Sequence, residues 1–176
     1  MRRPNFKGWV SRELAYLSGE NTLNMRRLAF LAQTKGSRLW ERLALYAIAT
    51  GQVERLRGFL YNEEMIADLD SLAGELGNTD FNDPQNIEKL HMPARVQKAL
   101  LSYKAAYKKI DSRNESKRLR LEKIVALQKK KGIPTARICE ALGLDSGNVS
   151  AYLKHADIGR LSLENATNVM KYLNAI

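Results

Sequence analysis

The sequence predicts an all-α protein, and three observations lead to that prediction. Nearly every segment repeats its apolar residues at the three- and four-residue spacing of a helix face. No stretch keeps the two-residue alternation of a half-buried strand. The 176 residues, 44% of them hydrophobic, are enough for one sizeable core or two small ones. We therefore expect an amino-terminal helical bundle followed by a second, smaller helical domain.

Residues 1–110 have the pattern of a bundle of short helices. Gly19, Gly36 and Gly51 separate the first helices and suit short turns between them. The stretch from Gly77 to Pro84 combines glycine, asparagine, aspartate and proline, and is the strongest loop signal in the chain. The expected helices cover residues 9–17, 23–33, 38–49, 53–61 and 63–76.

A long helix is expected after Pro93. Its apolar residues recur every three or four positions, a spacing that draws one stripe along a helix. Over two heptads, such a stripe is more typical of packing within the chain than of a coiled coil. The polar run of residues 111–116 breaks the pattern, so we predict a domain at 1–110, a linker at 111–117 and a second domain at 118–176. The stripe consists of Val96, Leu100, Tyr103, Tyr107 and Ile110.

The charge of the chain is strongly positive and unevenly distributed. The net charge is +10 and the isoelectric point is near 9.8. Residues 1–60 carry +7, 61–92 carry −7, 93–131 carry +10, and 132–176 carry no net charge. Lysines and arginines gain affinity for phosphates by releasing counterions, so a polyanionic partner such as double-stranded DNA is indicated. The alternative is a solvated surface of mixed sign.

Several classes of protein have no support in the sequence. No apolar run reaches the roughly 20 residues of a membrane span, and the start lacks a signal peptide, so we expect a cytoplasmic protein without membrane contact. The single cysteine, Cys139, fits a reducing compartment. Phosphate-binding glycine motifs and zinc-ligand spacings are absent. We therefore expect neither an enzyme nor a cofactor or metal site.

The strongest functional signal lies in residues 119–155. The segment 119–131 predicts a helix with Leu121, Ile124, Val125 and Leu127 facing inward. Two shorter helices are expected on either side of Gly143, with Asp145 or Ser146 capping the second. A helix-turn-helix needs a small residue within its first helix, a glycine in the turn and apolar residues at fixed offsets. Those places are taken by Cys139, Gly143, Leu144, Val149 and Tyr152.

On these residues the chain resembles the lambda-repressor-like family, also called the Xre family, from Arg118 to the end. Residues 159–166 resemble the capped fourth helix of that family. The resemblance implies a five-helix DNA-binding domain whose second short helix lies in the major groove. It also implies a sequence-specific transcriptional regulator, a repressor in most members, that binds double-stranded DNA as a homodimer.

The resemblance also assigns roles to individual side chains. Asn148 is the main candidate for base reading, because its amide can bond an adenine edge in both directions. Thr135 would offer its hydroxyl and the free amides of a helix start to a phosphate. The alternative for each residue is a cap or a solvated surface position. The candidate DNA-binding residues are Thr135, Ser146, Gly147, Asn148, Ser150, Ala151, Lys154 and Arg160, with Lys117, Arg118 and Arg120 as flanking phosphate contacts.

The role of residues 1–110 stays open in the sequence. This segment could mediate dimerisation, sense a ligand or bind a protein partner. The whole chain then fits one of two hypotheses. It is a transcriptional repressor, or it is an antitoxin or immunity-type protein that neutralises a partner and autoregulates its own operon through the helix-turn-helix domain.

Overall fold

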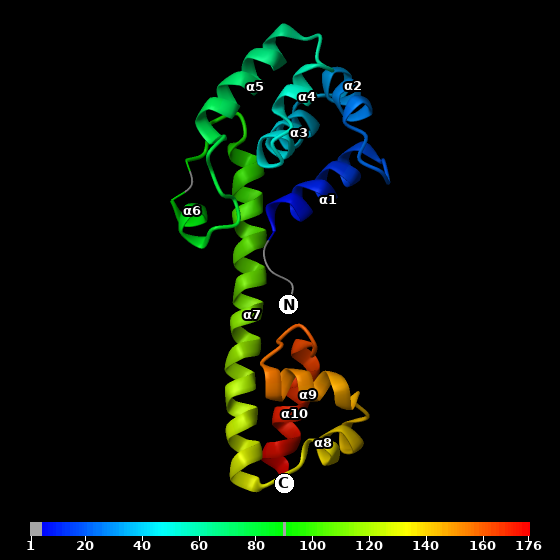
Figure 1. Ribbon diagram of the computed structural model, residues 1–176, viewed down its shortest axis with the longest axis vertical. Coiled ribbons are helices and arrows are strands. Elements are labelled where there is room, and N and C mark those ends of the chain that lie inside the picture. Colours follow the sequence, from blue (N-terminus) through cyan, green and yellow to red (C-terminus); the bar gives the residue numbers. More distant parts are fainter. Residues whose placement is uncertain (1–4, 90) are drawn as a thin grey trace. The chain divides into compact units, whose positions relative to one another are not determined.

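The computed structural model describes residues 5–89 and 91–176, which form ten helices (Figure 1). No strand occurs in this part of the chain, so the all-α prediction is confirmed. None of the described helices is long and apolar enough to cross a membrane. The helices are α1 (Phe6–Ser18), α2 (Met25–Lys35), α3 (Ser37–Ala49), α4 (Val53–Arg57), α5 (Glu63–Leu76), α6 (Pro84–Glu88), α7 (Gln97–Lys131), α8 (Thr135–Leu142), α9 (Ser146–His155) and α10 (Leu163–Ala175).

The chain divides into two compact units between Tyr107 and Lys108. We call residues 5–107 the amino-terminal unit and residues 108–176 the carboxy-terminal unit. Helix α7 contributes residues to both.

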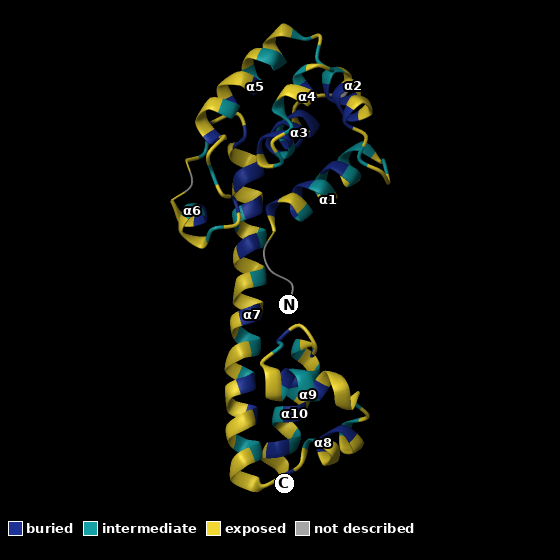
Figure 2. Ribbon diagram, viewed as in Figure 1, coloured by how far each residue is buried: buried dark blue, intermediate teal, exposed yellow. Residues whose placement is uncertain are grey.

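In the amino-terminal unit, the other helices gather around α3. Helices α1, α2, α4 and α5 all contact it. It is buried on most of its sides (Figure 2), as expected for a helix whose apolar residues are not confined to one stripe. Arg42 on α3 is buried as well, and its guanidinium pairs with Glu13 at 3.4 Å and Glu41 at 3.3 Å. These two carboxylates compensate the burial of the charge.

An aromatic cluster joins the two ends of this unit. Phe6 stacks on Phe81 with ring centroids 4.4 Å apart and meets the edge of Tyr103 at 4.7 Å. The hydroxyl of Tyr103 donates to the carbonyl oxygen of Phe81 at 2.7 Å. Val96, Leu100, Tyr103 and Tyr107 are all buried, so this part of the predicted stripe is a packing face within the chain.

Two short helices differ from the prediction. Helix α4 ends at Arg57 instead of residue 61, because the amides of Phe59 and Leu60 donate to the carbonyl oxygens three residues earlier, at 3.0 and 3.1 Å, and form tight turns. Helix α6 was not expected within a loop-rich stretch. Asp83 caps it through a hydrogen bond of 2.9 Å from the amide of Gln85, and Pro84 occupies its first turn, where a missing amide hydrogen costs nothing.

The predicted linker at 111–117 is wrong, since these residues continue α7 without a break. Small polar residues lower helix propensity by at most about 0.7 kcal/mol each, and a helix already formed on both sides propagates through them. Asn114 is itself buried, and Arg118 pairs with Glu115 one turn earlier at 3.5 Å. The polar run therefore makes the surface of α7 more polar but does not interrupt the helix.

The carboxy-terminal unit packs the second part of α7 with α8, α9 and α10 around a core of its own. This makes four helices among its described residues, so the predicted count of five is wrong. Residues 156–162 form a turn, and the predicted capped fourth helix is α10, which begins at Leu163 with Ser162 as cap. Val125, predicted to face inward, is 40% exposed. The core consists of Leu121, Ile124, Ile133, Ile138, Cys139, Val149, Tyr152, Ile158, Leu161, Ala166, Val169 and Leu173.

Candidate nucleic-acid interface

Helices α8 and α9 are joined by a tight turn of three residues, 143–145. Gly143 has φ 61° and ψ 35°, a left-handed conformation that strains residues with a β-carbon. The amide of Leu144 donates to the carbonyl oxygen of Cys139 at 3.0 Å and closes the end of α8. Asp145 then caps α9, because its carboxylate accepts from the amide of Asn148 at 2.7 Å. The predicted turn glycine and cap are therefore confirmed in their positions.

The two helices are fixed by side chains buried beneath them. Ile138 and Cys139 of α8 lie in the same core as Val149 and Tyr152 of α9. The hydroxyl of Tyr152 donates to the carbonyl oxygen of Lys117 at 2.8 Å, which ties α9 to α7. Burial raises the pKa of the Tyr152 phenol to about 12 and raises the pKa of the Cys139 thiol as well. Both groups are thus neutral packing residues at ordinary pH.

The start of α9 presents polar groups to solvent. Ser146, Gly147 and Asn148 are exposed, and Ser150 and Ala151 are half-buried one turn later. The side-chain amide of Asn148 has no hydrogen-bond partner within the described residues, since only its main-chain amide is used by the cap. The first turn of this helix therefore offers an amide and a hydroxyl that can donate and accept hydrogen bonds.

The start of α8 lies against the last turns of α7. Thr135 is the first residue of α8, and its hydroxyl oxygen accepts from the side-chain amide of Gln128 at 3.1 Å. That bond leaves the hydroxyl hydrogen available for an acceptor. The three lysines that follow Gln128 at the end of α7 are exposed, as is Arg137 in the first turn of α8. We call this trio, Lys129, Lys130 and Lys131, the outer lysines.

Sequence reasoning missed Gln128, Arg137 and the outer lysines as possible parts of the site. The run of three lysines before Gly132 belongs to the basic segment 93–131, but it was not singled out as a contact. Its position directly before the start of α8 was the signal that could have pointed to an anion-binding role.

Two predicted phosphate contacts turn out to be occupied within the unit. The ammonium of Lys117 donates to the carbonyl oxygen of Ile158 at 3.1 Å, and burial lowers its pKa, with the nearby Arg113 charge as a smaller cause. The guanidinium of Arg120 donates to the hydroxyl of Thr167 at 2.9 Å and to the carbonyl oxygen of Ser116 at 3.3 Å. We call Lys117 and Arg120 the inner cations. Their bonds hold α7 against the segment 158–167, and their predicted contact with DNA stays a prediction.

The other predicted cations remain at the surface. Lys154 is exposed near the end of α9. Arg118 pairs with Glu115, and Arg160 pairs with Asp157 at 3.3 Å. Exposed pairs of this kind contribute about 0–1 kcal/mol, so both guanidiniums can exchange a carboxylate for a phosphate at little cost.

No family model, curated protein or solved structure matches the chain. Among the described residues, no group of three histidine, cysteine, aspartate or glutamate side chains is arranged to hold a metal ion. The exposed start of α9 and the basic junction of α7 and α8 are therefore the features from which a function can be inferred.

Proposed function

We propose that the carboxy-terminal unit binds double-stranded DNA in a sequence-specific manner and that the protein is a transcriptional regulator acting as a repressor. The observation that carries this proposal is the first turn of α9. Its polar side chains are exposed, while Val149 and Tyr152 of the same helix are buried in the core of the unit. A rigid helix with an unengaged polar end is what base reading in the major groove requires.

In this proposal the amino end of α9 enters the major groove. The amide of Asn148 bonds an adenine edge in both directions, and the hydroxyls of Ser146 and Ser150 add single hydrogen bonds. Ala151 contributes a small apolar contact of the kind that suits a thymine methyl group. Gly147 has no side chain, which allows the main chain to approach the bases closely.

Phosphates on either side of the groove are held by the junction of α7 and α8. The Thr135 hydroxyl and the unpaired amides of the first turn of α8 donate to one phosphate. The outer lysines and Arg137 supply the positive charge around it, and Lys154 does the same at the far end of α9. The inner cations are left out of this set because each already holds a hydrogen bond within the unit.

We further propose that the protein acts as a homodimer. One short helix contacts too few base pairs to select a site in a genome, so two copies are needed on an inverted repeat with half-sites about one helical turn apart. The amino-terminal unit supplies the contact between copies. Light scattering should give twice the chain mass of 19.9 kDa, free or bound to the repeat. A monomer in both states contradicts this part of the proposal.

The decisive experiment compares two asparagines in the same unit. A preferred site is first selected from random duplexes, and binding is then measured for Asn148→Ala and Asn168→Ala. Asn168 is an exposed residue of α10 outside the proposed interface. Asn148→Ala should lose about 1–3 kcal/mol on the selected site and much less on random DNA, while Asn168→Ala should lose nothing on either. Equal losses on both duplexes for Asn148→Ala, or no selected site, would contradict the proposal.

A further inference from the structure

The amino-terminal unit contains a pocket between the start of α2, α3 and α4 that no step above has used. Its volume is about 470 Å³, within the range of roughly 300–1,000 Å³ typical of small-molecule sites. The floor is apolar and consists of the buried Met25, Leu28 and Leu43. Two half-buried aromatic side chains, Tyr46 and Phe59, form its walls. Thr22, Asn24 and Gln52 also line the pocket, so it offers a small molecule an apolar surface beside polar groups.

The rim of this pocket is cationic. Arg26 from α2 and Arg55 from α4 both line it, and no carboxylate does. Arg55 is oriented by Gln52, whose side-chain oxygen accepts from its guanidinium at 3.4 Å. Gln52 is held in turn by a bond of 3.0 Å from its amide to the hydroxyl of Thr50.

The carboxylates nearest in sequence are engaged by other arginines. Glu20 pairs with Arg27 at 3.3 Å, and Glu54 pairs with Arg57. The two positive charges at the rim are thus not neutralised by the acids that precede them. Their charge stays available to a ligand.

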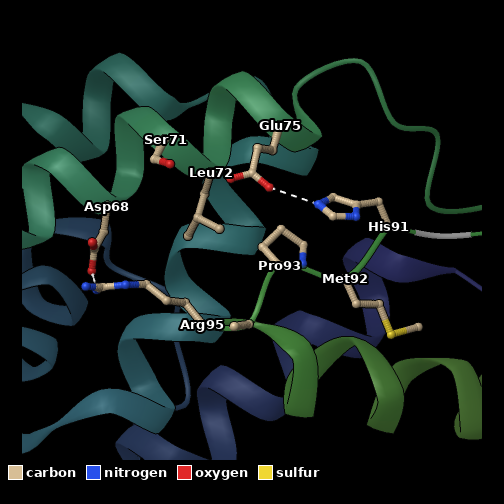
Figure 3. Close-up of a pocket in the computed structure, with 9 residues that line it drawn as sticks. Asp68, Ser71, Leu72, Glu75, His91, Met92, Pro93 and Arg95 are labelled. Atoms are coloured by element: carbon tan, nitrogen blue, oxygen red, sulfur yellow. Dashed lines mark hydrogen bonds and ion pairs between the residues drawn. The ribbon is translucent and has the colours of Figure 1, made fainter.

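A second pocket of the same unit shows the opposite arrangement (Figure 3). It has a volume of about 380 Å³. Arg95 pairs with Asp68, and the Nε2 atom of His91 lies 3.1 Å from the Glu75 carboxylate, so each carboxylate along its wall already has a partner. An ionic ligand would have to break one of these pairs. In the pocket of Arg26 and Arg55, a negatively charged ligand breaks no pair.

We propose that the pocket between α2, α3 and α4 binds an organic carboxylate with an apolar body, its charge held by Arg26 and Arg55 and its body by Met25, Leu28 and Leu43. A guanidinium matches a carboxylate with two parallel hydrogen bonds, which makes arginine suited to this task. The pocket lies entirely in the amino-terminal unit. The inference therefore stands independently of DNA binding by the other unit.

Methionine methyl groups report occupancy at this site. In NMR spectra of protein labelled at these methyls, octanoate should shift the signal of Met25 in a saturable manner. The Met92 methyl signal reports on the second pocket, and the Met170 methyl signal reports on the carboxy-terminal unit. Neither signal should shift when octanoate is added. Octanol, with the same chain and no charge, should bind at least about tenfold more weakly, because bonds to a charged partner are the stronger ones.

Two matched variants separate the pocket from general charge effects. Replacing Arg26 and Arg55 together by glutamine should weaken octanoate binding at least about tenfold. Both side chains are exposed, so the fold should be retained, and the unchanged Met65 methyl signal checks this. Lys7→Gln combined with Arg12→Gln removes the same two charges at exposed positions of α1 outside the pocket and should bind like the parent protein. An unshifted Met25 signal, equal binding of octanol, or equal affinity in the double variant would overturn the proposal.

Discussion

The inner cations and the outer lysines lie on the same helix within about three turns of each other, yet they differ in what their charges can do. Lys117 and Arg120 bond to groups that follow them by 41 and 47 residues in the chain. The outer lysines are exposed at the end of α7. The difference teaches that a count of basic residues does not identify an anion-binding surface. What matters is whether the fold supplies each cation with a partner of its own.

The largest effect that this comparison predicts is the loss of DNA affinity on removing the outer lysines. Replacing Lys129, Lys130 and Lys131 together by glutamine should weaken binding to any duplex roughly 100-fold near physiological salt. The slope of log affinity against log salt should fall by about 2.7, since each phosphate contact contributes about 0.9. Binding measured over a series of salt concentrations checks both values.

The control for this variant carries the same change of charge at other exposed positions of the unit, namely Lys109, Lys123 and Lys171. It should leave the salt slope nearly unchanged. If both triple variants flatten the slope equally, the lysines act only through net charge, and the proposed contact surface at the junction of α7 and α8 is wrong.

A smaller effect is expected on replacing the inner cations. It should lower the stability of the unit and leave DNA binding unchanged. Lys117→Met combined with Arg120→Gln should lower the free energy of unfolding of the carboxy-terminal unit by about 2 kcal/mol, or about 1 kcal/mol for each of the two lost hydrogen bonds to the segment 158–167. Urea titration followed at the Met170 methyl signal measures this, since Met170 packs against the core of that unit. Lys123→Gln on the same helix should be neutral. A flattened salt slope without loss of stability would return the inner cations to the DNA-binding surface.

The smallest effect concerns the bond that joins α9 to the main chain of the same Lys117. Tyr152→Phe removes it and leaves the carbonyl oxygen of Lys117 without that donor, at a cost of about 1 kcal/mol. The folded state raises the pKa of Tyr152 to about 12 from an ordinary value near 10. The phenol therefore stays protonated in the folded chain at pH values where the unfolded chain loses the proton. Its contribution is complete below pH 10 and is lost as the pH rises towards 12.

The advantage of the parent protein over Tyr152→Phe should accordingly shrink between pH 10 and about pH 12 in urea titrations at the Met170 signal. Tyr16→Phe serves as the matched control, because Tyr16 is 85% exposed in the other unit. An advantage that does not change over this range would show that ionisation of Tyr152 is not linked to unfolding.

The sequence by itself determined the features that depend on neighbours along the chain. Helix α5 has the predicted bounds, Gly143 ends α8 in the left-handed region, and Asp145 caps α9. Capping and periodicity involve residues within about four positions of one another, so their signals can be read locally. The same holds for the buried stripe that begins at Val96.

Only the tertiary structure decided the features that depend on distant partners. Asn114 in the polar run at 111–116 is buried although its neighbours along the chain are polar. Val125 is 40% exposed, whereas Leu121, Ile124 and Leu127 pack in or against the core. The bonds that occupy Lys117 and Arg120 reach into the segment 158–167, and no local pattern encodes which carbonyl or hydroxyl will meet a given cation. Packing determines these partners, and therefore which positive charges remain available to an external anion.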